Sequence, residues 1–378
     1  MVLFVQARPV SNPIQHLEGS SGTSEDEMNA VTGPLESALA ELLERFHAAE
    51  AVALGRAISL VENERPGFED FLHEVLRVGP SAARIGFTGP PGAGKSSLLS
   101  VVATIWRTRN EQLGVVAVDP TSPYSGGALL GDRIRMSDLA TDPGIFIRSM
   151  ATRGSLGGLA TTTKEVIDLM DAFGFDRVLV ETVGVGQTQI EITAAADTVI
   201  VVLVPESGDA IQAMKAGLME IADIFVVNKA DRPGADRLVK DLRQGLHLRV
   251  DTVLESEPVY HGLDLARIRR KESGEEFKGP GWSPPVLSTV AQSGEGVEHL
   301  MDMIEAHRSW LEESGELEER RRARGKVRIQ DVVDRELRRT AWHSDALLAV
   351  LDQGLDRIQK GKDTPYSVAW DIVNRLLR

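Results

Sequence analysis

The chain has 378 residues, a formal net charge of −14 and no cysteine. This length exceeds most single hydrophobic cores, so we expect one large domain with helical additions, or two domains. The acidic balance argues against a nucleic-acid partner, and the absence of cysteine excludes disulfides, thiolate zinc sites and cysteine nucleophiles. No apolar run approaches the roughly 18 residues of a membrane-spanning helix, so we expect no membrane partner. The absence of cysteine fits a cytoplasmic location.

The N-terminal part divides by composition. Residues 1–33 carry few large apolar side chains after Val5 and are expected to form a disordered leader. Over residues 34–78 the apolar positions recur at spacings of three and four, as at Leu39, Leu42 and Leu43. This spacing predicts amphipathic helices that pack beside the next domain.

A phosphate-binding loop is predicted at residues 89–96, which read Gly-Pro-Pro-Gly-Ala-Gly-Lys-Ser and follow an apolar run at 83–88. This sequence fits the pattern G-x-x-x-x-G-K-[ST] between a strand and a helix. The backbone N–H groups of such a loop surround phosphate oxygens, Lys95 reaches the β- and γ-phosphates, and the Ser96 hydroxyl faces Mg²⁺. We therefore expect a nucleoside triphosphate as ligand, held by Gly89, Gly92, Ala93, Gly94, Lys95 and Ser96.

Strand-length apolar runs alternate with helical patterns after this loop. They lie at 115–119, 144–148, 177–181, 197–204, 223–228 and 285–290. This alternation predicts an α/β fold with a mostly parallel sheet covered by helices, spanning residues 79–313. A ligand of such a sheet binds at the carboxyl ends of the strands.

Three acidic residues are candidate magnesium ligands, directly or through water. Asp119 closes one strand and Asp132 lies in the glycine-rich loop that follows it, although a helix-cap or turn role is equally open for each. Glu181 ends another strand in Glu-Thr-Val-Gly, where the carboxylate can hold a magnesium-bound water and the Gly184 N–H can meet the γ-phosphate.

The tetrapeptide Asn228-Lys229-Ala-Asp231 directly follows a further strand. A carboxylate at Asp231 can accept hydrogen bonds from the guanine ring N–H and amine, a pattern that adenine does not offer. Val290 and Ala291 close the last strand, and their backbone is expected to contact the base. These positions predict GTP and GDP, rather than adenine nucleotides, as ligands.

The tail, residues 314–378, carries 14 Lys and Arg against 11 Asp and Glu. Apolar stripes at helical spacing predict a helical arm that packs on a second subunit as a homodimer, or alternatively on the chain's own N-terminal helices. The stripes consist of Leu347, Leu351, Leu355 and Ile358, and of Trp370, Val373 and Leu377.

Taken in order, these motifs resemble those of the MeaB/MMAA/ArgK-type P-loop GTPases over roughly residues 50–313. The resemblance implies phosphate contacts from residues 92–97, including Ser97, and from Arg135. It also implies Mg²⁺ near Ser96, Asp119, Asp132 and Glu181, and guanine contacts from Asn228, Lys229 and Asp231.

The family resemblance further implies a chaperone that uses GTP to gate adenosylcobalamin loading of an acyl-CoA mutase, such as methylmalonyl-CoA mutase, and to protect that enzyme. Two alternatives stay open: a phosphotransferase of an arginine/ornithine transport system, and a GTP-dependent assembly factor for another metal cofactor.

Slow intrinsic hydrolysis is expected. Lys95, Glu181 and Gln187 are the candidate catalytic residues, but the position after Gly184 is Val185, which has no polar atom to orient the attacking water. Gln187 lies two residues further along. A mutase that orders this loop would then accelerate hydrolysis.

Overall fold

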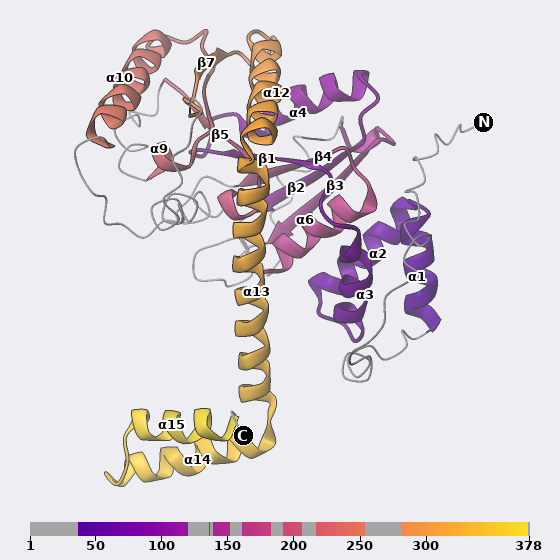
Figure 1. Ribbon diagram of the computed structural model, residues 1–378, viewed down its shortest axis with the longest axis vertical. Helices are drawn as coiled ribbons and strands as arrows, with labels where there is room; N and C mark the ends of the chain where they lie inside the picture. The colour runs from indigo at the N-terminus through magenta and orange to yellow at the C-terminus, as the bar shows by residue number, and fades with distance from the viewer. Residues whose placement is uncertain are drawn as a thin grey trace, which may run out of the picture. The chain divides into compact units, whose positions relative to one another are not determined.

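The computed structural model describes residues 37–119, 136, 139–151, 161–182, 192–205, 217–253 and 281–376. The chain divides into two compact units, residues 1–320 and 321–378. Figure 1 labels the helices and strands of both units.

The first unit is built on a seven-stranded sheet with the order β3-β2-β4-β1-β5-β6-β7. Every neighbouring pair of strands is parallel, which confirms the predicted parallel sheet and all seven expected strands. The strands are β1 (Ala83–Thr88), β2 (Leu113–Asp119), β3 (Ile145–Ala151), β4 (Arg177–Thr182), β5 (Thr198–Leu203), β6 (Ile224–Asn228) and β7 (Val286–Thr289).

Successive side chains of the strands enter the cores on opposite faces of the sheet. On one face, Phe87 and Leu179 pack with helices α4 (Lys95–Thr108) and α12 (Val297–Ser314). On the other face, Val178 packs with helix α6 (Thr161–Phe173), and Val201 packs with helix α10 (Ala235–Val253). Short turns of helix complete this unit: η2 (Leu139–Thr141), η3 (Ile192–Ala194) and α9 (Leu218–Ile221).

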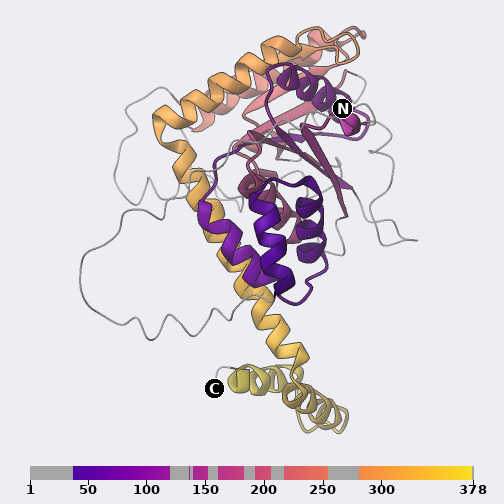
Figure 2. The same ribbon diagram turned by 90° about the vertical axis from the view of Figure 1, so that its right-hand side faces the viewer.

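The N-terminal helices form one group beside α6, drawn in indigo in Figure 2. They are α1 (Ser37–His47), α2 (Ala51–Glu62) and α3 (Phe68–Val75), followed by the short helix η1 (Leu76–Val78). The ring of Phe46 on α1 packs edge-on against Phe71 on α3 and Phe173 on α6, with centroids 5.6 and 5.2 Å away. This aromatic cluster joins the expected N-terminal helices to the sheet domain.

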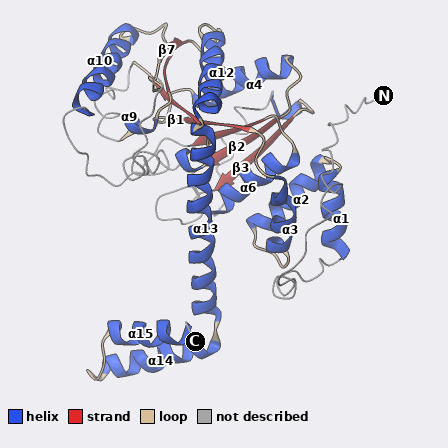
Figure 3. Ribbon diagram, in the orientation of Figure 1, coloured by secondary structure: helices blue, strands red, loops and turns tan. Residues whose placement is uncertain are grey.

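Helix α13 (Glu316–His343) begins in the first unit and continues into the second. The second unit also contains α14 (Asp345–Gln359) and α15 (Pro365–Leu376), which lie side by side in Figure 3. Leu347 and Val350 of α14 pack on Val368 and Ile372 of α15. Gly354 permits this close approach, because a Cβ there would lie 2.3 Å from Val368 Cγ1.

This hairpin buries part of the apolar stripes that were expected to pack on a second subunit or on the N-terminal helices. Leu347, Leu351 and Ile358 of the first predicted stripe are used inside the hairpin, whereas Leu355 is exposed. Trp370 and Val373 of the second stripe are also exposed, and Leu377 lies outside the described residues. Among the helices that the structure describes, none is long and apolar enough to cross a membrane.

Candidate nucleotide-binding site

The predicted phosphate loop connects the end of β1 to the start of α4. Gly89, Gly92 and Gly94 all have positive φ angles of 133°, 76° and 84°. At Gly89 a Cβ would lie 2.0 Å from the carbonyl oxygen of Val202, so only glycine fits there. The loop therefore turns through positive-φ backbone conformations that residues other than glycine rarely adopt, as the motif predicts.

Lys95 lies at the start of α4 with its ammonium group inside the loop. Its Nζ donates hydrogen bonds to the carbonyl oxygens of Gly89 and Pro90, at 3.0 and 3.1 Å, and the side chain is buried. The positive charge is thus placed among the loop's own carbonyls, where phosphate oxygens are stronger acceptors. Ser97 follows on the same helix and is exposed.

Ser96 and Glu181 meet on the α4 face of the sheet. Ser96 Oγ donates a hydrogen bond to Glu181 Oε1 at 2.7 Å, and both side chains are buried. Glu181 comes from β4, which lies between β1 and β2. A hydroxyl beside a carboxylate is the hard-oxygen chemistry that Mg²⁺ prefers, so these two residues fit that ion.

Of the other residues predicted to bind magnesium or phosphate, or to act in catalysis, the structure describes only the backbone of Asp119. Asp119 ends β2, the strand beside β4, so its backbone reaches the same edge of the sheet as Glu181. The side chain of Asp119 is not described. Outside the described residues lie Asp132, Arg135, Gly184 and Gln187.

Asn228 joins the phosphate loop to the loop after β7. Its Nδ2 donates to the carbonyl oxygen of Ala93 at 2.9 Å, while its Oδ1 accepts from the Ala291 N–H at 3.1 Å and from Thr289 Oγ1 at 3.2 Å. Lys229 has a φ of 57° and donates from Nζ to the Gly92 carbonyl oxygen at 2.9 Å. Both residues therefore buttress the loop that would hold the phosphates.

Asp231 is exposed, and its carboxylate has no hydrogen bond or ion pair within the part of the chain that the structure describes. A carboxylate free in this way can accept the two N–H groups of a guanine edge. The N–H groups of Val290 and Ala291 already have partners, since Val290 donates to the Glu295 carbonyl oxygen at 2.9 Å and Ala291 donates to Asn228. Their predicted contact with the base stays a prediction.

Sequence reasoning missed two threonine contacts in this region. Thr289 bonds Asn228, and Thr88 is hydrogen-bonded to Thr182 at 2.9 Å. Their positions in the sequence could have indicated these contacts, because each threonine ends a strand directly beside a motif residue or loop.

The family model described as "Methylmalonyl Co-A mutase-associated GTPase MeaB" matches residues 54–346. The chain belongs to the MeaB family. It is 43% identical over 342 residues to a putative GTPase of Pyrococcus horikoshii, covering 89% of this chain and 98% of that relative. It is 36% identical over 254 residues to a mouse protein named methylmalonic aciduria type A homolog, mitochondrial, covering 67% of this chain and 56% of the mouse protein.

Among solved structures, the chain is similar to one titled LAO/AO transport system kinase. The TM-score is 0.60 at 24% identity, covering 92% of this chain and 100% of the other. This likeness supports the P-loop NTPase fold alone. Membership of the MeaB family adds the activity: the protein is a GTPase, which binds guanine nucleotides and hydrolyses GTP.

Proposed function

We propose that this MeaB-family GTPase uses GTP hydrolysis to gate the loading of adenosylcobalamin into an acyl-CoA mutase such as methylmalonyl-CoA mutase, and to protect that mutase. The family description, which names a mutase-associated GTPase, supports the partner. The 2.7 Å contact between Ser96 and Glu181 supports a metal-dependent hydrolytic site. The expected cytoplasmic location stays a prediction from composition.

Mg²⁺ is the proposed cofactor, with Ser96 as ligand and Glu181 holding it directly or through water. When bound, this ion would neutralise the negative charge that develops on the phosphate oxygens during transfer. Asp119 and Asp132 are proposed as further ligands. Lys95 would exchange its loop carbonyls for the β- and γ-phosphates, because charge-assisted hydrogen bonds to phosphate are stronger.

Guanine selectivity is assigned to Asp231, whose exposed carboxylate would accept the base. Asn228 and Lys229 would act by fixing the phosphate loop at Ala93 and Gly92. We also propose phosphate contacts from Ser97, Arg135 and Gly184.

Slow turnover in the isolated protein is part of the proposal. Phosphoryl transfer depends on positioning and charge stabilisation, and Val185 offers no polar atom for the attacking water. Gln187 would supply that function once a partner orders the loop. Coupling in binding is reciprocal, so the nucleotide would also change the affinity for the mutase.

A homodimer is proposed through the second unit. Ile329, Val333 and Leu337 recur every four residues on α13 and are 67%, 48% and 45% exposed. Tyr366 and Trp370 form a further exposed apolar pair on α15. A second copy would cover such stripes, which monomers rarely leave in water.

The test is single-turnover GTP hydrolysis with and without a candidate mutase. We expect slow hydrolysis alone and acceleration with the mutase, with the acceleration lost in Gln187→Ala. Lys95→Ala should abolish turnover, whereas Lys240→Ala, an exposed lysine on α10, should change neither rate. Fast hydrolysis alone, or no response to any mutase of the same cell, would contradict the gating role. Phosphate transfer to an acceptor other than water would then favour the phosphotransferase alternative, and capture of another metalloenzyme would favour the assembly factor.

A further inference from the structure

Thr88 and Thr182 meet beside the phosphate loop. Thr88 ends β1 directly before Gly89, and Thr182 ends the neighbouring strand β4 directly after Glu181. Thr182 Oγ1 donates a hydrogen bond to Thr88 Oγ1 at 2.9 Å, and both residues are 0% exposed. Within the described part of the chain, neither hydroxyl has another hydrogen-bond partner. Among the described residues each hydroxyl thus has only the other as its partner, and a buried hydroxyl without a partner is costly.

The end of β4 thus contacts the phosphate-loop segment on both faces of the sheet. Glu181 points to the α4 face, where it accepts the hydrogen bond from Ser96. Successive strand residues point to opposite faces, so Thr182 points away from α4 and reaches Thr88 there. Two consecutive residues of one strand therefore hold both ends of the same loop segment.

The two contacts would respond differently to a metal ion. Mg²⁺ at the proposed site would add a ligand bond to Ser96 Oγ and attract the Glu181 carboxylate, which changes the surroundings of that hydrogen bond. The threonine pair shares no atom with that site. It can keep the ends of β1 and β4 in register while Glu181 changes its contacts.

We propose that Thr88 and Thr182 are a positioning pair, which holds Glu181 at the distance from Ser96 that Mg²⁺ binding and GTP hydrolysis require. This inference rests on the proposed Mg²⁺ site. The pair lies on the face of the sheet opposite the Ser96–Glu181 contact and would act through the backbone positions of Glu181 and Gly89.

The experiment measures how much Mg²⁺ strengthens GDP binding, as the ratio of GDP dissociation constants without and with the ion, by calorimetric titration of the full-length protein. The variants are Thr88→Val, Thr182→Val and the double variant, which leaves no unpaired buried hydroxyl and so protects folding. Thr198→Val is the matched control. Its hydroxyl is also buried and makes a 2.9 Å hydrogen bond, to His307 Nδ1. Thr198 begins β5, however, and so lies at the amino ends of the strands, away from the phosphate loop.

We expect each single valine variant to lose at least about fivefold of the Mg²⁺ enhancement, the size of one hydrogen bond. The double variant should lose no more than the larger single effect, because the two residues form one interaction. Thr198→Val should keep the wild-type enhancement. The rate of GTP hydrolysis at saturating GTP should fall in parallel with the enhancement.

Two results would overturn the inference. One is a wild-type Mg²⁺ enhancement in all three valine variants. The other is an equal loss in Thr182→Ser and Thr182→Val, since serine keeps the hydroxyl and the loss would then come from packing. A wild-type protein whose GDP affinity ignores Mg²⁺ would instead contradict the proposed Mg²⁺ site, and the pairing inference with it.

Discussion

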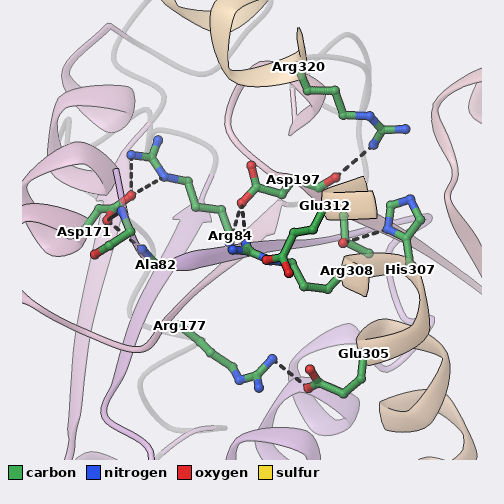
Figure 4. A network of polar contacts seen from close by, with 12 residues as sticks. Ala82, Arg84, Asp171, Arg177, Asp197, Glu305, His307, Arg308, Glu312 and Arg320 are labelled. Atoms are coloured by element: carbon green, nitrogen blue, oxygen red, sulfur yellow. Dashed lines mark hydrogen bonds and ion pairs between the residues drawn. The ribbon is translucent and has the colours of Figure 1, made fainter. Parts of the chain in front are cut away.

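Arg320 and Asp223 form a two-point ion pair at the amino ends of the strands, opposite the candidate nucleotide site. Arg320 Nη2 lies 2.9 Å from Asp223 Oδ1, and Nη1 lies 3.0 Å from Oδ2. Nη1 also donates to the Asp197 carbonyl oxygen at 2.9 Å, as drawn in Figure 4. Asp223 precedes β6 and Arg320 lies in the first turns of α13, so this pair fixes the beginning of that helix to the sheet.

The stability of the protein should fall in acid through Asp223. Burial by itself would raise the pKa of this carboxyl, but Arg320 and His307 beside it hold the pKa well below its ordinary value. A carboxyl whose pKa is lower in the folded state stabilises the protein above the unfolded pKa of about 4, and this stabilisation is lost as the pH falls through the folded pKa. Chemical unfolding between pH 7 and pH 2 should show a steeper loss in the wild type than in Asp223→Asn. Parallel curves would contradict the assignment.

Arg320→Met should destabilise the first unit by about 1–3 kcal/mol, because the buried Asp223 carboxylate loses its strongest donor. Arg322→Met, two residues further along α13 and exposed, should change the free energy of unfolding by less than about 0.5 kcal/mol. Thermal and denaturant unfolding give both values. An Arg320 variant as stable as the Arg322 variant would show that His307 and the Val199 N–H suffice for Asp223.

Asp231→Asn should weaken GTP and GDP binding by about 10- to 100-fold, because the guanine N–H groups lose a charged acceptor. The amide should shift preference toward xanthine nucleotides, whose ring presents an acceptor to the new N–H donor. Asp236→Asn, on the exposed first turn of α10, is the control and should bind guanine nucleotides normally. Titrations with guanine, adenine and xanthine nucleotides decide the matter; equal affinity of the wild type for GTP and ATP would exclude this role of Asp231.

Gly94→Ala should weaken nucleotide binding strongly. Its φ is 84°, and a Cβ there would lie 2.4 Å from Asn228 Nδ2, so both the loop and its buttress must shift. Gly55→Ala is the contrasting variant, since nothing lies within 4 Å of a Cβ in that position on α2. Alanine at position 55 should stabilise the protein by roughly 0.5–1 kcal/mol through helix propensity. Calorimetric GDP titration and thermal unfolding of both variants would test the contrast.

Val333→Glu should convert the proposed dimer into a monomer at micromolar concentration, because it places a charge in the exposed apolar stripe of α13. Val52→Glu, at an even more exposed valine on α2, should leave the mass unchanged. Sedimentation measures both, and removal of residues from 316 onward should likewise give monomers that bind GTP. A wild-type monomer at these concentrations would refute the dimer.

Much of the candidate site was predictable because its motifs are contiguous. The glycines, Lys95 and Ser96 of the phosphate loop follow one another, and their chemistry depends on backbone turns that the local sequence fixes. The strands were predictable for a related reason, since an apolar run of strand length between turn residues is itself a local signal. Asn228 and Asp231 were found through their place after such a run.

Contacts between segments required the tertiary structure. The order of strands puts β4 between β1 and β2, and only this neighbour relationship brings Glu181 to Ser96 and Thr182 to Thr88. The apolar period of the tail identified its helices, yet it did not distinguish Leu347, which packs inside the hairpin, from Leu355, which is exposed. The sequence by itself determined the local turns, the strands and the nucleotide motifs. The tertiary structure alone decided which side chains meet, because hydrogen bonding and packing between distant residues depend on the order and register of the elements, and no local pattern encodes these.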